Sequence, residues 1–155
     1  MKINKNENLL FPTFLKTIHS ISDQFKRETG TRVVIHETWR NYERQQWLYE
    51  QGRTRKGPVV TNTTKSLHSL GLACDIVGDI SPLPGVQGPY DIDFKAFGAI
   101  VLSHSMVWGG KWQDMVHVEM RGPYSTSEIF DMADKHGILY VWHKLEQYYA
   151  AYPSF

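Results

Sequence analysis

Apolar residues recur at helical spacing near the start of the chain. Pro12 lies at the beginning of this pattern and Gly30 just past its end, which are start and stop signals of a helix. We therefore predict an amphipathic helix between these two residues. Its apolar positions are Phe11, Phe14, Leu15, Ile18, Ile21 and Phe25.

The next segments alternate between strand, helix and loop patterns. Residues 33–39 are rich in β-branched and aromatic side chains, which favours a strand. Asn41 can cap a second helix that runs to about Glu50 and stops at Gly52. The polar stretch 53–65 is typical of a loop.

The middle of the chain predicts two more strands and one more helix. Residues 71–77 indicate a buried strand, and the Pro- and Gly-rich stretch 78–90 indicates an irregular loop. Asp93 can cap a third helix that reaches about residue 105. Residues 116–121 alternate well enough for another strand, after a turn at 109–110.

Two helices are predicted at the C-terminal end. Ser125 and Glu128 have the spacing of a capping box, and that helix ends at Gly137. A last amphipathic helix follows. The mixture of helices and strands without strict alternation predicts an α+β fold with a small antiparallel sheet flanked by helices. We expect one domain over 1–155, with the helices of about 125–152 packed on it or appended to it.

Composition narrows the function classes. The chain has 155 residues, of which 41% are hydrophobic, and this suits one packed core. Seventeen Lys and Arg against sixteen Asp and Glu give no strong global field, so we expect neither nucleic acid nor a membrane as partner. Cys74 is the single cysteine, which excludes an intrachain disulfide and a Cys-rich zinc finger.

No targeting signal is visible in the sequence. The apolar stretch 9–15 is short, contains Pro12 and has no small-residue cleavage site. No apolar run approaches the ~20 residues that a membrane-spanning helix needs. We therefore expect a soluble product made in the cytoplasm, and a monomer.

Three side chains suggest metal chemistry. His68, Asp75 and His117 offer two imidazoles and a carboxylate, a set that suits zinc and leaves a position for water. Asp114 precedes His117 by three residues and can take a proton from that water. The alternative is ordinary structure: a capping histidine, a solvated aspartate at a strand end, and an aspartate that caps a turn.

Several segments resemble one family in the same order. The run Ser66 to Asp75 matches the S-x-H-x-x-G-x-A-x-D signature of the D-Ala-D-Ala-type metallopeptidases, and Asp114 to His117 matches their D-x-x-H motif. Residues 38–49 resemble the family's Y-R-x-x-x-x-Q-x-x-L-Y segment. Residues 108–112 read W-G-G-K-W, as in the endopeptidase branch. The resemblance spans about residues 38–119 and implies the hedgehog-like fold of this family.

The resemblance also implies roles. His68, Asp75 and His117 would hold Zn²⁺ and Asp114 would be the general base. Arg40 would stabilise the developing oxyanion; its alternative is a structural ion pair at the strand end.

Three further positions carry weaker expectations. Ser66 and Gln45 match family positions that contact substrate. For Ser66 the alternative is a contact with the His68 backbone, and for Gln45 it is packing or support behind the metal ligands. Cys74 should be a small core residue that points away from Asp75, with a fourth zinc ligand as the alternative.

Three functions remain open. The Asp of D-x-x-H and the W-G-G-x-W stretch favour an L-alanyl-D-glutamate endopeptidase that cuts the stem peptide of bacterial peptidoglycan, as a phage or prophage endolysin that reaches the cell wall at lysis. The alternatives are a D-Ala-D-Ala carboxypeptidase and a non-catalytic, zinc-binding, hedgehog-like module. Asp114 and Arg40 argue against the last, because a pure binding module needs no base.

Overall fold

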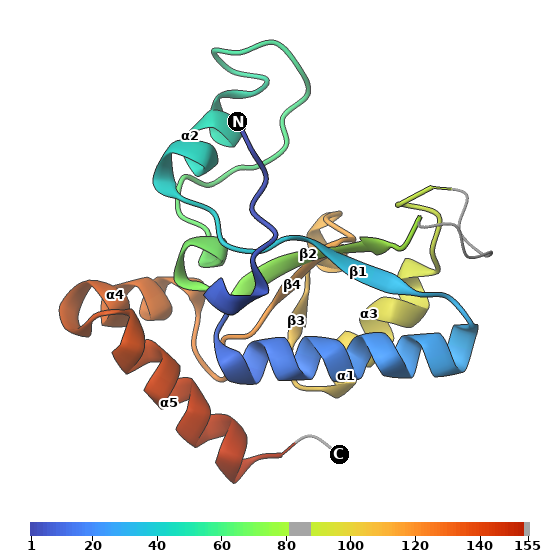
Figure 1. The fold of residues 1–155 in the computed structure, drawn as a ribbon. Helices are drawn as coiled ribbons and strands as arrows, with labels where there is room; N and C mark the ends of the chain where they lie inside the picture. Colours follow the sequence, from blue (N-terminus) through green and yellow to red (C-terminus); the bar gives the residue numbers. More distant parts are fainter. Residues whose placement is uncertain (81–87, 154–155) are drawn as a thin grey trace.

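A four-stranded antiparallel sheet is the centre of the fold (Figure 1). The computed structural model describes residues 1–80 and 88–153. The strand order is β1-β2-β4-β3. This arrangement confirms the predicted α+β class. The strands are β1 (Val33–Glu37), β2 (Ala73–Gly78), β3 (Val107–Trp108) and β4 (His117–Glu119).

The described helices surround this sheet, and most start where the sequence predicts. Gly30 ends the first helix with φ 76°, and the Asn41 side chain caps the second by accepting from Arg44 N. Ser125 and Glu128 form a complete capping box. The α-helices are α1 (Pro12–Thr29), α2 (Tyr42–Glu50), α3 (Phe94–Ser103), α4 (Thr126–His136) and α5 (Ile138–Ala151). Short 3₁₀ helices are η1 (Glu7–Leu9), η2 (Leu67–Leu70) and η3 (Gly109–Trp112).

The main core lies between the sheet, α1 and α3. Phe25 of α1 and Phe97 of α3 meet edge to face, with ring centroids 5.6 Å apart. Cys74 of β2 is fully buried in this core and pairs with Val118 of β4. The thiol therefore points away from Asp75, as the alternation of side chains along a strand requires.

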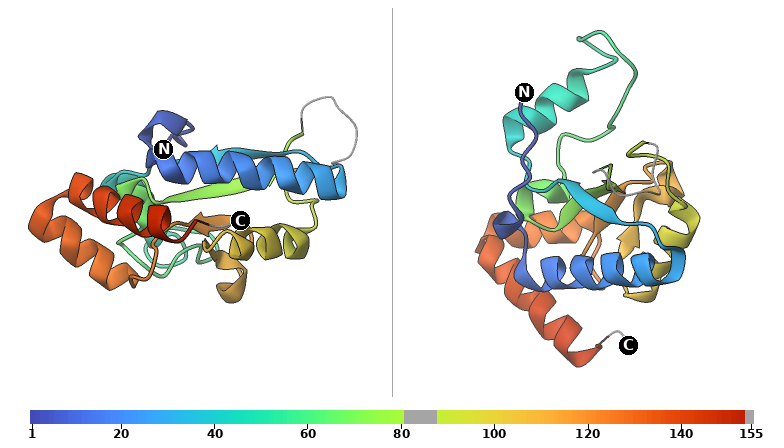
Figure 2. Two further views of the ribbon diagram at one scale, coloured as in Figure 1. Left: turned by 90° about the horizontal axis from the view of Figure 1, so that it is seen from below. Right: turned by 45° about the vertical axis from the view of Figure 1, so that its right-hand side comes forward.

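The C-terminal helices share this core. Val141, Leu145 and Tyr149 of α5 are buried among residues of the rest of the chain. Trp142 also donates from its indole Nε1 to the Leu70 carbonyl over 2.9 Å. Figure 2 shows α4 and α5 side by side at one end of the molecule. These contacts connect α5 directly to η2.

Some sequence boundaries differ from the structure. The strand expected over 33–39 ends at Glu37, which is the last residue of β1 paired with β2. The turn expected at 109–110 is the start of η3, and the two-residue strand β3 is too short to carry a sequence signal. Part of the loop expected over 78–90, namely 81–87, lies outside the described residues. Within the described ranges, no helix has the length and apolarity needed to cross a membrane.

Candidate metal centre

Three predicted ligand residues converge beside the two inner strands of the sheet, β2 and β4. One nitrogen or oxygen from each of His68, Asp75 and His117 lies within 4.8 Å of the other two. His68 comes from η2, Asp75 from β2 and His117 from β4. Within residues 1–80 and 88–153, no other group of three His, Cys, Asp or Glu side chains meets this criterion.

The turn that carries His68 is fixed at both ends. Ser66 Oγ accepts from the His68 amide over 3.3 Å and caps η2. Gly71 ends η2 with φ 68°, a left-handed conformation that glycine adopts without strain. The chain then enters β2, so a sharp turn separates His68 from Asp75.

The ring of His68 has one nitrogen in use and one without a partner. Nδ1 lies 2.6 Å from the Thr38 carbonyl oxygen. A carbonyl oxygen only accepts, so Nδ1 carries a proton, and Nε2 is the nitrogen that faces Asp75. Nε2 is buried, makes no hydrogen bond and lies 3.3 Å from Asp75 Oδ1. A buried polar atom without a partner is costly, which fits an atom that binds a metal ion.

His117 lies between two carboxylates. Its Nδ1 is 3.3 Å from Asp75 Oδ1, and its Nε2 is 2.9 Å from Glu119 Oε1. Burial alone would lower the pKa of His117, but the hydrogen bonds to Asp75 and Glu119 outweigh it and raise the pKa to about 10. Burial likewise raises the pKa of Asp75, and the His68 and His117 charges reverse this and hold it well below its usual range. The cluster therefore keeps Asp75 ionised.

The donor set fits a metal ion. Two imidazoles and an ionised carboxylate are common ligands of divalent transition metals. His68 Nε2 and His117 Nδ1 both face Asp75, while the opposite ring nitrogens are held by Thr38 and Glu119. Hydrogen bonds of this kind fix the ring orientation of histidine ligands. Cys74 faces the core and is not part of the cluster.

Asp114 lies beside the cluster, in the turn that leads into β4. Its backbone amide donates to the Gly109 carbonyl over 3.0 Å, and the His117 amide donates to the Asp114 carbonyl over 3.2 Å. A Cβ on Gly109 would lie 2.4 Å from the Asp114 carbonyl oxygen, so this turn requires glycine. Burial raises the pKa of Asp114; the His117 charge opposes this shift and the Asp75 charge adds to it. Asp114 therefore lies within electrostatic reach of the ligands.

Arg40 belongs to a buried network of ion pairs. Its Nη2 donates to Glu37 Oε2 over 2.7 Å and to Asp75 Oδ2 over 3.2 Å, and its Nη1 donates to Gln45 Oε1 over 2.9 Å. Arg44 also pairs with Glu37. Burial alone would raise the pKa of Glu37, but hydrogen bonds from Arg44 and Arg40 lower it. Arg40 therefore contacts both Asp75, a candidate metal ligand, and Glu37, which is part of a structural ion pair.

Gln45 links Arg40 to the loop that follows α2. Its Nε2 donates to the Thr63 carbonyl over 2.7 Å, while its Oε1 accepts from Arg40. Arg53 and Arg55 hold the same loop by stacking on Tyr49 and Trp47, at 4.0 and 3.6 Å from the ring centroids. The loop is therefore fastened to α2.

Sequence reasoning missed two carboxylates of this centre. Glu119 contacts His117, and Glu37 contacts Arg40. Glu119 follows His117 by two residues in a strand, so the period of two puts both side chains on one face. That signal was available in the sequence. Glu37 is the last residue of β1 and directly follows a register shift, so its position had no such signal.

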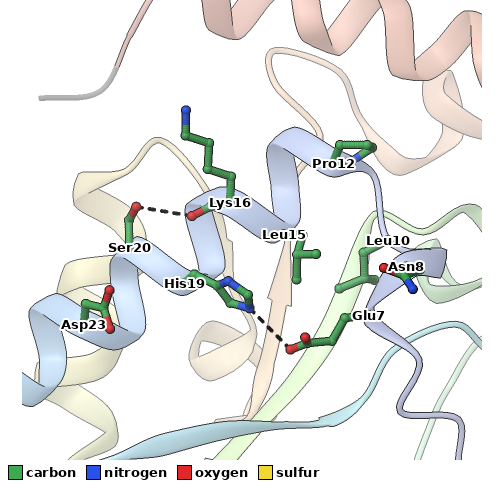
Figure 3. A pocket seen from close by; sticks show the side chains of 9 residues that line it. All are labelled: Glu7, Asn8, Leu10, Pro12, Leu15, Lys16, His19, Ser20 and Asp23. Atoms are coloured by element: carbon green, nitrogen blue, oxygen red, sulfur yellow. Dashed lines mark hydrogen bonds and ion pairs between the residues drawn. The ribbon is translucent and has the colours of Figure 1, made fainter.

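A separate cavity lies away from the metal cluster. It encloses about 490 Å³ between η1 and α1 and is lined in part by Glu7, Leu15, His19 and Asp23 (Figure 3). His19 Nε2 and Glu7 Oε1 lie 3.3 Å apart across it. None of the three cluster residues lines this cavity.

Part of the chain is similar to known proteins. Residues 60–120 match a family described as D-alanyl-D-alanine carboxypeptidase. The chain is 34% identical to the peptidoglycan L-alanyl-D-glutamate endopeptidase CwlK of Bacillus subtilis, over 59% of this chain and 62% of that protein. The match thus spans less than two thirds of that relative.

A solved structure has a similar fold. The L-Ala D-Glu endopeptidase ChiX of Serratia marcescens superposes with a TM-score of 0.50 over 74% of this chain and 82% of that one, at 20% identity. The matched family segment contains His68, Asp75, Asp114 and His117 in the order of the two motifs. In its motifs and in this matched segment, the chain is similar to the D-Ala-D-Ala-type metallopeptidases.

Proposed function

We propose that the chain is a zinc-dependent peptidase that hydrolyses the L-Ala–D-Glu bond in the stem peptide of bacterial peptidoglycan. The observation that carries the proposal is the convergence of His68, Asp75 and His117, with Asp114 next to them. The relative CwlK, by its name, is an endopeptidase for this bond.

The donor set supports zinc as the metal. Zinc commonly binds two histidines and one carboxylate in hydrolytic sites and keeps a position for water. When bound, it would supply the Lewis acidity that peptide hydrolysis needs. The unpartnered Nε2 of His68 and the Nδ1 of His117 are the ring nitrogens placed to hold it.

The remaining steps belong to protein side chains. We assign Asp114 to accept a proton from the attacking water and to return it to the amine that leaves when the C–N bond breaks. Its raised pKa makes the carboxylate a better base. Arg40 is a fixed cation beside Asp75, and its charge also reaches Asp114. We assign it to stabilisation of the negative charge that develops on the carbonyl oxygen.

In this proposal, Ser66 and Gln45 support other residues of the site through hydrogen bonds. Ser66 Oγ holds the His68 amide, and Gln45 holds Arg40 with one end and the Thr63 carbonyl with the other. These contacts support the alternatives set out for both residues, namely support of the ligand turn and of Arg40, in preference to contact with substrate.

A carboxypeptidase is the second candidate, because the matching family carries that description. Such an enzyme releases a terminal D-Ala and must bind a free carboxylate. The L-alanyl-D-glutamate relative and the Asp at position 114 favour the endopeptidase.

Digestion of purified Gram-negative peptidoglycan, followed by mass spectrometry of the products, tests the proposal. We expect new N-terminal D-Glu and L-Ala left on the muramyl sugar. Release of free D-Ala without a D-Glu terminus would move the protein to the carboxypeptidase class. Zinc binding without cleavage of either bond would leave the hedgehog-like binding module.

Cleavage of this bond also suggests a biological role. Cutting L-Ala–D-Glu detaches stem peptides from the glycan strands and so weakens the whole wall. We propose a phage or prophage endolysin that acts on the wall as a monomer after release at lysis. Addition of the protein to permeabilised Gram-negative cells should then lower their turbidity, and light scattering after gel filtration should give a mass near 17.9 kDa.

A further inference from the structure

We propose that Glu119 is a positioning residue for the metal centre: its carboxylate fixes the ring of His117 so that Nδ1 faces Asp75 and the metal. The inference rests on the proposed zinc site and adds a residue that neither motif contains. Glu119 Oε1 lies 2.9 Å from His117 Nε2. A carboxylate accepts only, so Nε2–H donates to Glu119, and Nδ1, which faces Asp75, is the nitrogen that would bind the metal.

The backbone of Glu119 is held from both sides. β4 is an inner strand, and Glu119 pairs with Ala73 of β2 and with Val107 of β3. Ala73 places only a methyl group opposite Glu119 on the face that carries the cluster. The carboxylate therefore has a fixed origin and room beside the ring of His117.

The two histidines receive different partners. His68 Nδ1 donates to the neutral carbonyl of Thr38, whereas His117 Nε2 donates to an ionised side chain. A charge-assisted hydrogen bond is shorter and stronger than a neutral one, and it makes the imidazole a stronger ligand. Glu119 thus makes His117 a stronger metal ligand than a backbone carbonyl in its place would.

A structural ion pair is the competing explanation for Glu119. Arg121 Nε lies 3.8 Å from Glu119 Oε2, and Arg121 Nη1 donates to Thr126 Oγ1 at the start of α4 over 3.0 Å. This contact is longer than the one to His117, and the Arg121 side chain is 28% exposed. A long ion pair that is open to solvent contributes little stability. The distances therefore favour His117 as the partner that Glu119 serves.

Zinc affinity measured by competition with a chromogenic chelator tests the proposal without any peptidoglycan. We expect Glu119→Ala to raise the Kd about 10- to 100-fold. Glu119→Gln keeps an oxygen that can accept from Nε2–H but loses the charge, so its Kd should lie between wild type and Glu119→Ala. Cobalt-loaded Glu119→Ala should also show shifted d–d absorption bands, because the ring of His117 is no longer held.

Two controls make the result specific. Glu43→Ala removes an exposed carboxylate from the first turn of α2 and should keep the wild-type Kd. Melting of the metal-free proteins separates loss of fold from loss of ligand geometry. A Kd and cobalt spectrum of folded Glu119→Ala equal to those of wild type would overturn the role of Glu119. Failure of the wild-type protein to bind zinc would instead refute the proposed metal site itself.

Discussion

Asp75 lies directly opposite His117 in the antiparallel pairing of β2 with β4. Residues opposite each other in such a pair have Cβ atoms about 4.5–5.5 Å apart on the same face. Two proposed ligands that are far apart in sequence are thus brought together by the register of the sheet. A slip of one residue would turn Asp75 into the core and place Cys74 at the metal. The apolar face of β2 that holds Cys74 therefore also protects the geometry of the site.

The first prediction concerns metal content. Wild-type protein should bind about one zinc per chain, and His117→Ala should bind much less, because only two protein ligands remain. Elemental analysis of both proteins after gel filtration measures this. His143→Ala, which removes an exposed histidine of α5, is the matched control and should keep its zinc. Equal zinc in wild type and His117→Ala would refute the ligand assignment.

The second prediction concerns the base. Asp114→Asn is nearly isosteric and leaves the three ligands in place, so the protein should fold and bind zinc. Hydrolysis of muropeptides should fall about 10²- to 10⁴-fold, the usual effect of losing a general base. Rates of zinc-loaded protein, normalised to metal content, measure this. Hydrolysis at the wild-type rate would show that another group accepts the proton.

The fold could be predicted well where local signals are strong. Capping by Asn41, Asp93 and Ser125 and the helical spacing of apolar residues gave the five α-helices within a few residues. Short elements were missed, because β3 has two residues and the 3₁₀ helices have three or four. Elements of that length are defined by pairing and turns with distant residues, which leave no periodic pattern.

The candidate site, like the fold, could be predicted only in part. The ligands His68, Asp75 and His117 were identified from family motifs and meet in space. Thr38, which contacts His68, and Glu37, which contacts Arg40, depend on where the chain passes after the register shift in β1, and tertiary structure alone sets that path. No pattern in the sequence indicated that Arg40 contacts Asp75 and Glu37 at once.

The third prediction separates the two roles of Arg40. Arg40→Lys keeps a positive charge but loses the planar fork that bonds to Glu37, Asp75 and Gln45. If Arg40 acts on the transition state, turnover should fall by at least tenfold, with only a modest change in melting temperature. Steady-state kinetics and thermal melting of the zinc-loaded protein provide the two measurements.

Arg44→Lys is the matched variant for this test. Arg44 pairs with the same Glu37 but contacts none of the metal ligands. It should lose a similar amount of stability and keep its turnover. If both variants keep wild-type turnover, Arg40 is a structural ion pair and the oxyanion must be stabilised by other groups.

The last prediction concerns the turn between His68 and Asp75. Gly71 has φ 68°, and a Cβ there would lie 2.6 Å from the Leu9 carbonyl oxygen and 3.0 Å from Trp142 Cζ2. Gly30 has nearly the same φ, 76°, but open space around its Cβ position. In both Gly→Ala variants, the left-handed backbone conformation should destabilise the folded state by about 1–2 kcal/mol. Only Gly71→Ala adds a steric clash, which typically costs about 1–3 kcal/mol more.

Urea unfolding of the metal-free variants should show this difference in free energy. The clash involves backbone and a ring, so the turn itself must move and carry His68 with it. We therefore expect Gly71→Ala also to bind zinc more weakly, while Gly30→Ala keeps the wild-type affinity. If both variants lose equal stability and retain equal affinity, the close approach of Leu9 does not constrain the turn. Gly71 would then be required only for its left-handed backbone conformation.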